Sequence, residues 1–131
     1  MSYFQKVVDF NTQFGVNVHD TPQLNIFNND PNTVDFCMKL IREENKELEQ
    51  AVIDNNFVEV ADAIADSIYV LLGMSARLGI NMDNVFNLVH DNNMAKLCLT
   101  EQEAQKSVQY YLDNPNLGYE SPNYRKAPNN I

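Results

Sequence analysis

Two groups of acidic residues lie in the middle of this chain, and the first group interrupts an apolar helix face. Glu43, Glu44 and Glu47 follow the pattern EExxE. Because successive helical residues are about 100° apart, Glu44 falls at the centre of an apolar stripe. The other members of that stripe are Cys37, Leu40, Ile41, Leu48 and Ala51. A carboxylate is costly to bury unless something neutralises it, and since few basic residues lie nearby, we expect a divalent metal ion.

The second acidic group comprises Glu59, Asp62 and Asp66, which share a wedge of about 60° on a helical wheel. Asp62 and Asp66 are four residues apart, where like charges repel along a helix, so a bound cation is favoured there. Glu59 has an alternative role, because it would complete a capping box with Asn56. Hard cations such as Mg²⁺ take oxygen ligands, and two carboxylate sets on neighbouring helices could hold them.

The spacing of apolar residues predicts the elements that carry these groups. The expected helices cover residues 3–14, 32–54, 57–79, a stretch from 81 or 82 onward, and 101–112. On the third of these, a core stripe is expected at Val58, Ala61, Ala65, Ile68, Leu72 and Ala76. A long loop is expected at 15–32 and an irregular tail from Asn114. Because the break at 54–56 is short, helices 32–54 and 57–79 should be antiparallel neighbours, which would bring the two acidic groups together.

The composition is typical of one soluble globular domain, with 131 residues, 44% hydrophobic and 21% charged. The net charge of −9 disfavours binding to nucleic acid or to an anionic membrane. No apolar run is long enough to span a bilayer, and the N-terminus lacks the features of a signal peptide. We therefore expect a cytoplasmic protein, or one in the host cytoplasm if it is viral. Cys37 and Cys98 lack metal-ligand spacing and are expected to be reduced core thiols.

Several motifs occur in order between Asp9 and Lys96. They are Asp9-Phe10-Asn11, Phe14-Gly15, Asp20-Thr21-Pro22, Leu40-Ile41-Arg42-Glu43-Glu44, Glu59-Val60-Ala61-Asp62-Ala63-Ile64-Ala65-Asp66 leading into Tyr69-Val70, and Val89-His90-Asp91-Asn92-Asn93-Met94-Ala95-Lys96. Together these motifs resemble the all-α nucleoside triphosphate pyrophosphohydrolase superfamily, which includes MazG-like and phosphoribosyl-ATP pyrophosphohydrolase-like proteins. The similarity is greatest to a small single-domain branch often found in phages.

The resemblance implies an all-α fold in a single domain spanning 1–131. Its core would be a four-helix bundle over about residues 3–97, followed by an extra helix and the tail in 98–131. It also implies assembly as a homodimer or homotetramer. The implied reaction is hydrolysis of a nucleoside triphosphate between the α and β phosphates, with two or three Mg²⁺ or Mn²⁺ ions per site.

The superfamily's metal ligands fall in EExxE and in a following ExxD. EExxE maps onto the first acidic group. ExxD is ambiguous: Glu59-Val60-Ala61-Asp62 fits it literally, whereas alignment on the aspartate before Tyr69-Val70 selects Asp66. Glu59, Asp62 and Asp66 are therefore all retained as metal ligands, with the two aspartates favoured.

Two further roles are assigned to residues of the chain. Glu43 or Glu47 could accept a proton from the attacking water. Asn93 and Lys96 match an NxxK pattern whose residues, by the resemblance, contact the phosphates or the sugar.

The predicted function is metal-dependent hydrolysis of a (d)NTP to the (d)NMP and pyrophosphate, with base contacts from residues 15–32 and from a partner subunit. The substrates that fit are a purine deoxynucleotide (dGTP or dATP) in phage metabolism, a non-canonical nucleotide, and dUTP or dCTP. One alternative is a catalytically silent helical module that binds nucleotide or protein. The other is hydrolysis of phosphoribosyl-ATP in histidine synthesis.

Overall fold

The computed structural model describes residues 1–97 and 100–114, which form six helices and no strand. The helices are α1 (Tyr3–Gln13), α2 (Ile26–Asn29), α3 (Pro31–Ile53), α4 (Phe57–Leu78), α5 (Met82–Met94) and α6 (Glu101–Asp113). The all-α prediction is confirmed, and each predicted helix end lies within one residue of the observed one. The short helix α2 lies in a segment predicted as loop, because four residues are too few to show a helical period. Cys98 and the tail from residue 115 lie outside the described residues.

The chain divides into two units, Met1–Val85 and Phe86–Ile131. The first unit contains α1 to α4 and the first turn of α5. The second contains the rest of α5 and α6. The division falls inside α5, before the predicted end of the core near residue 97, and the single-domain assignment stays a prediction. None of α1 to α6 combines the length and apolar composition that a bilayer span requires.

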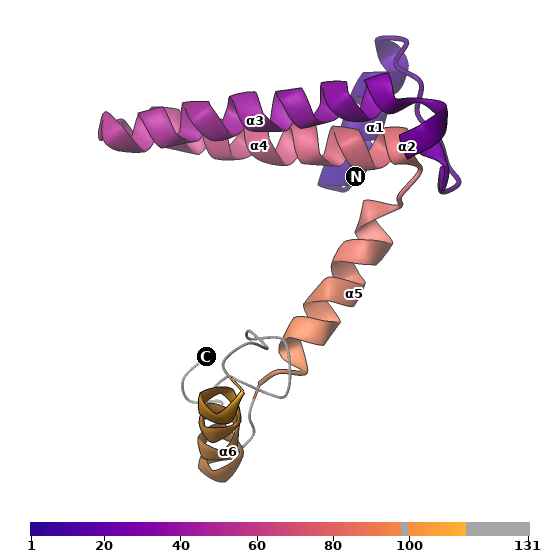
Figure 1. The fold of residues 1–131 in the computed structure, drawn as a ribbon. Helices are drawn as coiled ribbons and strands as arrows, with labels where there is room; N and C mark the ends of the chain where they lie inside the picture. The colour runs from indigo at the N-terminus through magenta and orange to yellow at the C-terminus, as the bar shows by residue number, and fades with distance from the viewer. Residues whose placement is uncertain (98–99, 115–131) are drawn as a thin grey trace. The chain divides into compact units, whose positions relative to one another are not determined.

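In the first unit, α3 and α4 run antiparallel along most of their length, while α1 packs against α4 and α2 against α3 (Figure 1). The buried apolar residues are mostly small: Ala51 on α3, and Ala63 and Ala76 on α4. Small side chains allow the two helix axes to approach closely. The predicted stripe of α3 is confirmed, because Cys37 and Ala51 are buried and the other apolar members are half-buried.

The conformation of the turn between α3 and α4 is explained by its residues, 54–56. Asn55 has a positive φ of 54°, a conformation that asparagine tolerates better than most residues. Asn56 is the N-cap of α4 and accepts a 3.2 Å hydrogen bond from the Glu59 N–H through its side chain. This turn fixes which residue of α3 faces which residue of α4.

The loop before α2 is anchored on the C-terminal end of α4. The His19 N–H donates to the Ala76 carbonyl at 3.0 Å, and the Gln23 N–H donates to the Leu78 carbonyl at 2.9 Å. The His19 side chain adds a 2.8 Å contact from Nδ1 to the Arg77 carbonyl. These bonds satisfy carbonyl groups that the end of a helix leaves unpaired.

The predicted core stripe of α4 is wrong for most of its length. Val58, Ala61, Ala65 and Ile68 are exposed in the single chain, whereas the buried residues of α4 are Ala63, Ser75 and Ala76. Because α4 is apolar on more than one face, periodicity could not select the face that packs on α3. The exposed face lines a groove of about 300 Å³ between α1 and α4.

Substitution of Gly79 tests how much the anchored loop contributes to stability, and the same substitution at Gly15 is the matched control. Both have φ of 74°, but a Cβ at Gly79 would overlap the Thr21 carbonyl oxygen, whereas a Cβ at Gly15 meets no atom within 4 Å. Gly15→Ala should cost only the strain of the left-handed backbone, about 1–2 kcal/mol. Gly79→Ala should destabilise more in urea unfolding, because the loop must also move. Equal losses would show that the loop does not depend on this close approach.

Candidate metal centre

Three of the six predicted acidic ligands converge on the α3–α4 pair. One carboxylate oxygen from each of Glu44, Glu47 and Asp66 lies within 4.8 Å of the other two. Glu44 and Asp66 are half-buried, and Glu47 is exposed. The cluster therefore has a shielded base formed by two carboxylates and one carboxylate open to solvent.

The turn explains why these residues meet. Glu44 precedes Asn55 by eleven residues and Asp66 follows it by eleven, so the two lie opposite each other on the antiparallel helices. Glu47 is three residues after Glu44 and shares its side of α3. The residue at the matching distance from Asn55 on α4 is Ala63, which is small and buried.

The electrostatics of the cluster disfavour three ionised carboxylates. Burial raises the pKa of Glu44, and the nearby carboxyls of Glu47, Asp66 and Glu43 raise it further. Burial likewise raises the pKa of Asp66, with additional contributions from the Asp62 and Glu47 charges. Acidic groups that repel one another in a partly dry site are typical of positions that receive a cation.

The donor atoms also fit a metal ion. Glu44 Oε2 is buried and has no hydrogen-bond partner, and leaving such an acceptor unpaired costs about 1–3 kcal/mol. A divalent cation with oxygen ligands would satisfy this atom and remove the repulsion among the three carboxylates. Glu44, Glu47 and Asp66 are thus the residues that could hold Mg²⁺ or Mn²⁺.

The other three predicted ligands lie at the edge of this cluster or outside it. Asp62 is exposed, but its carboxyl is close enough to Asp66 to raise the pKa of that residue. Glu43 is exposed and contributes charge to Glu44. Glu59 is exposed near the start of α4, where its N–H is capped by Asn56. Of the two predicted proton acceptors, Glu47 is in the cluster and Glu43 is beside it.

Asn93 and Lys96 belong to the second unit, and the structure brings them together. Lys96 is buried, with 7% of its surface exposed, and its Nζ donates a 3.1 Å hydrogen bond to Asn93 Oδ1. A buried lysine is unusual unless it is paired. The NxxK spacing thus produces one connected pair of polar side chains.

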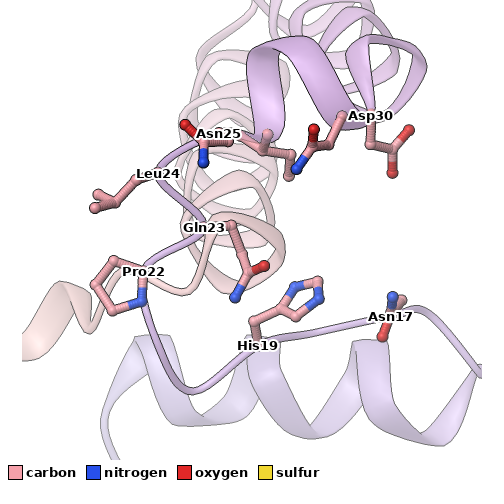
Figure 2. Close-up of a pocket in the computed structure, with 9 residues that line it drawn as sticks. Asn17, His19, Pro22, Gln23, Leu24, Asn25 and Asp30 are labelled. Carbon is pink, nitrogen blue, oxygen red and sulfur yellow. The ribbon is translucent and has the colours of Figure 1, made fainter.

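A second polar site, which we call the loop pocket, lies beside the anchored loop (Figure 2). It has a volume of about 430 Å³. Its lining residues are Asn17, His19, Pro22, Gln23, Leu24, Asn25, Ile26, Asn29 and Asp30. The sequence indicated that this segment could contact a ligand, but its polar residues have no periodicity from which a pocket could be derived. The loop pocket is separate from the acidic cluster, because Asp30 precedes Glu44 by fourteen residues, about 21 Å of helix.

The sequence is similar to a known protein family. The model of the phosphoribosyl-ATP pyrophosphohydrolase family matches residues 7–93, a range that includes all six acidic residues and Asn93. The chain belongs to this family. The family is part of the MazG-like nucleoside triphosphate pyrophosphohydrolase superfamily, so the predicted superfamily is confirmed.

The chain is also similar to a protein from a virus. Uncharacterized protein L479 of Acanthamoeba polyphaga mimivirus is 42% identical over 81 residues, which are 62% of this chain. The matched region is 32% of the length of that protein, so the chain covers only about a third of it.

Glu44→Gln should stabilise the protein in the absence of divalent cations. The amide removes one charge and can donate a hydrogen bond to a neighbouring carboxylate, a gain of about 1 kcal/mol. Because the raised pKa of Glu44 makes the folded state bind its proton more tightly, wild-type stability falls as pH rises through the titration range. The advantage of Glu44→Gln should therefore be largest at neutral pH and shrink towards about pH 4, the ordinary carboxyl pKa.

Thermal unfolding in EDTA across this pH range measures the effect. Glu49→Gln is the matched control, because Glu49 is exposed on the same helix. An advantage that is the same for both variants, or that does not depend on pH, would contradict the electrostatic account of the cluster.

Proposed function

We propose that this chain hydrolyses a nucleoside triphosphate to the nucleoside monophosphate and pyrophosphate, using divalent cations held by Glu44, Glu47 and Asp66. The observation that carries the proposal is the convergence of these carboxylates around a buried oxygen without a hydrogen-bond partner. Membership in a pyrophosphohydrolase family supports the same class of reaction. The proposed ions are magnesium or manganese, two or three per site. Asp62 and Glu43 are proposed as further ligands at the edge of the cluster, and Glu59 as a further ligand nearer the start of α4.

The proposed roles of the carboxylates in the cluster differ with their exposure to solvent. Bound cations would offset the charge on the triphosphate and make a water molecule more acidic. Glu44 and Asp66 hold their oxygens on the half-buried side of the cluster, where partial exclusion of water strengthens their attraction for cations. Glu47 is exposed and can accept a proton from water while remaining in contact with solvent. Glu43, one residue before Glu44, is the second proposed proton acceptor.

The proposal also covers the identity of the substrate, its contacts outside the acidic cluster and the state of the protein. We infer a (d)NTP, with a purine deoxynucleotide, a non-canonical nucleotide, and dUTP or dCTP as the candidates. Asn93 and Lys96 are the proposed contacts to phosphate or sugar. A homodimer or homotetramer in the cytoplasm, with no nucleic-acid partner, is the proposed state of the protein.

Phosphoribosyl-ATP is a second candidate substrate because the matching family model carries that name. Its hydrolysis would use the same carboxylates, since it too has a triphosphate to be cleaved between the α and β phosphates. Assaying it beside the (d)NTP panel separates the two candidates directly.

Pyrophosphate release with Mg²⁺, Mn²⁺ or EDTA tests the function. We expect turnover of at least one triphosphate, no turnover in EDTA, and a loss of at least about 100-fold in kcat for Glu44→Gln, because a removed site charge in a shielded centre costs on this scale. Glu49→Gln should retain wild-type turnover. Nucleotide binding without turnover in the wild type would instead indicate the catalytically silent module.

A further inference from the structure

A cavity of about 230 Å³ lies within the first unit between α1, α3 and α4, and we call it the aromatic cavity. Three aromatic rings line it: Phe10 from α1, Phe36 from α3 and Tyr69 from α4. The rings of Phe10 and Tyr69 meet edge to face at 5.5 Å. The guanidinium of Arg77, the one charged residue of the lining, lies 5.1 Å from the centre of the Phe36 ring.

The aromatic cavity lies next to the acidic cluster along the same pair of helices. Cys37 and Gly73 both line the cavity, and each is eighteen residues from Asn55. Each is also seven residues from its neighbour in the cluster, Glu44 or Asp66, which is about 10 Å of helix. A molecule that places phosphates at the cluster could therefore extend its other end into the cavity.

The volume indicates what that end could be. Pockets that enclose a whole drug-sized ligand measure about 300–1,000 Å³, so 230 Å³ suits a single planar ring system. Aromatic faces bind nucleobases by stacking, at about 1–3 kcal/mol per base. Nearly half of the Phe10 and Phe36 surfaces, 45% each, is exposed in the single chain. These rings thus have surface that is available to a ligand.

The loop pocket fits this role less well. It is about twice as far from the acidic cluster along α3, and its lining contains amide, histidine and carboxylate groups but no aromatic ring from phenylalanine or tyrosine. The loop predicted to contact the base still takes part, because Val16 lines the aromatic cavity.

We propose that the aromatic cavity binds the nucleobase of the triphosphate whose phosphates are held at Glu44, Glu47 and Asp66. This inference rests on the proposed function and adds the location and chemistry of base recognition. The base inserts among the rings of Phe10, Phe36 and Tyr69. Arg77 has only hydrogen-bond donors, so it recognises acceptor atoms on the edge of the base.

Two polar or small residues complete the site. Asn11 lines the cavity with 7% of its surface exposed, and its Nδ2 donates to the Val7 carbonyl at 2.8 Å. Oδ1 is therefore the amide atom available as an acceptor for a base N–H. Gly73 leaves space at the α4 wall, where a Cβ would lie 3.8 Å from Asn11 Nδ2 and 4.0 Å from Val7 Cγ1. Larger side chains at Gly73 would occupy the position of the base.

The experiment uses Gly73→Leu to fill the cavity and Phe36→Leu to remove a ring. A Cβ at Gly73 would make ordinary contacts, and replacing glycine favours the helix; thermal unfolding of Gly73→Leu beside wild type checks that the longer side chain leaves the fold intact. Phe57→Leu is the matched control, because Phe57 is 86% exposed at the start of α4 and does not line the cavity. Circular dichroism confirms that each variant is folded.

The first readout is turnover of the preferred triphosphate. Gly73→Leu should raise KM at least about 10-fold with a much smaller change in kcat, because the lost interaction is with the base and not with the reacting phosphate. Phe36→Leu should raise KM in the same direction, and Phe57→Leu should behave as wild type. Unchanged KM in both cavity variants would overturn the inference and leave the proposed function intact.

The second readout is binding of nucleosides in EDTA by calorimetry, which requires neither metal nor turnover and avoids repulsion between a phosphate and the empty acidic cluster. Wild type and Glu49→Gln should bind alike, and Gly73→Leu should bind at least about 10-fold more weakly. If no triphosphate is hydrolysed but this binding pattern holds, the base site stands and the proposed function fails. Binding that is absent in the wild type, or equal in Gly73→Leu, would overturn the inference.

Discussion

The arrangement of the first unit depends on the register between α3 and α4, which a three-residue turn fixes. Asn55 takes the left-handed conformation and Asn56 caps α4, so the turn sets the register of the two helices. This register sets Glu44 opposite Asp66. A shift by one residue would turn each side chain about 100° away from its partner, and the three carboxylate oxygens could not remain within 4.8 Å.

The same register orders the sites along the helix pair. The acidic cluster lies roughly eleven residues from the turn, the aromatic cavity is centred about one to two helical turns further on, and the loop pocket lies where the anchored loop meets the far end. At the acidic cluster, folding stability and the proposed binding of cations make opposite demands. Like charges and an unpaired buried oxygen cost folding free energy there, as expected of a site that gains its stability when a cation binds.

Much of this arrangement could be predicted from local patterns. The ends of α3 and α4 could be predicted because Asp30-Pro31, Asn56 and Gly79 are strong start and stop signals. The position of Glu44 on the buried side of α3 followed from a single amphipathic stripe. The antiparallel pairing followed from the short turn, and with it the meeting of the two acidic groups.

Other features depend on tertiary contacts that the pattern does not encode. The predicted stripe of α4 failed because that helix is apolar on several faces. ExxD spacing could not distinguish Glu59, Asp62 and Asp66, whereas distance from Asn55 brings Asp66 to the cluster. The aromatic cavity joins Phe10, Phe36 and Tyr69 from three helices. Each ring by itself is typical of core packing, so no local pattern groups the three.

The central claim is that Glu44, Glu47 and Asp66 together form a cation site. Its most direct test is a Mn²⁺ titration followed by electron paramagnetic resonance on wild type, Glu44→Gln, Asp66→Asn and the exposed control Glu49→Gln. The account predicts that the tightest Mn²⁺ site is present in wild type and Glu49→Gln and is lost in the other two. Equal Mn²⁺ affinity in all four proteins would contradict it.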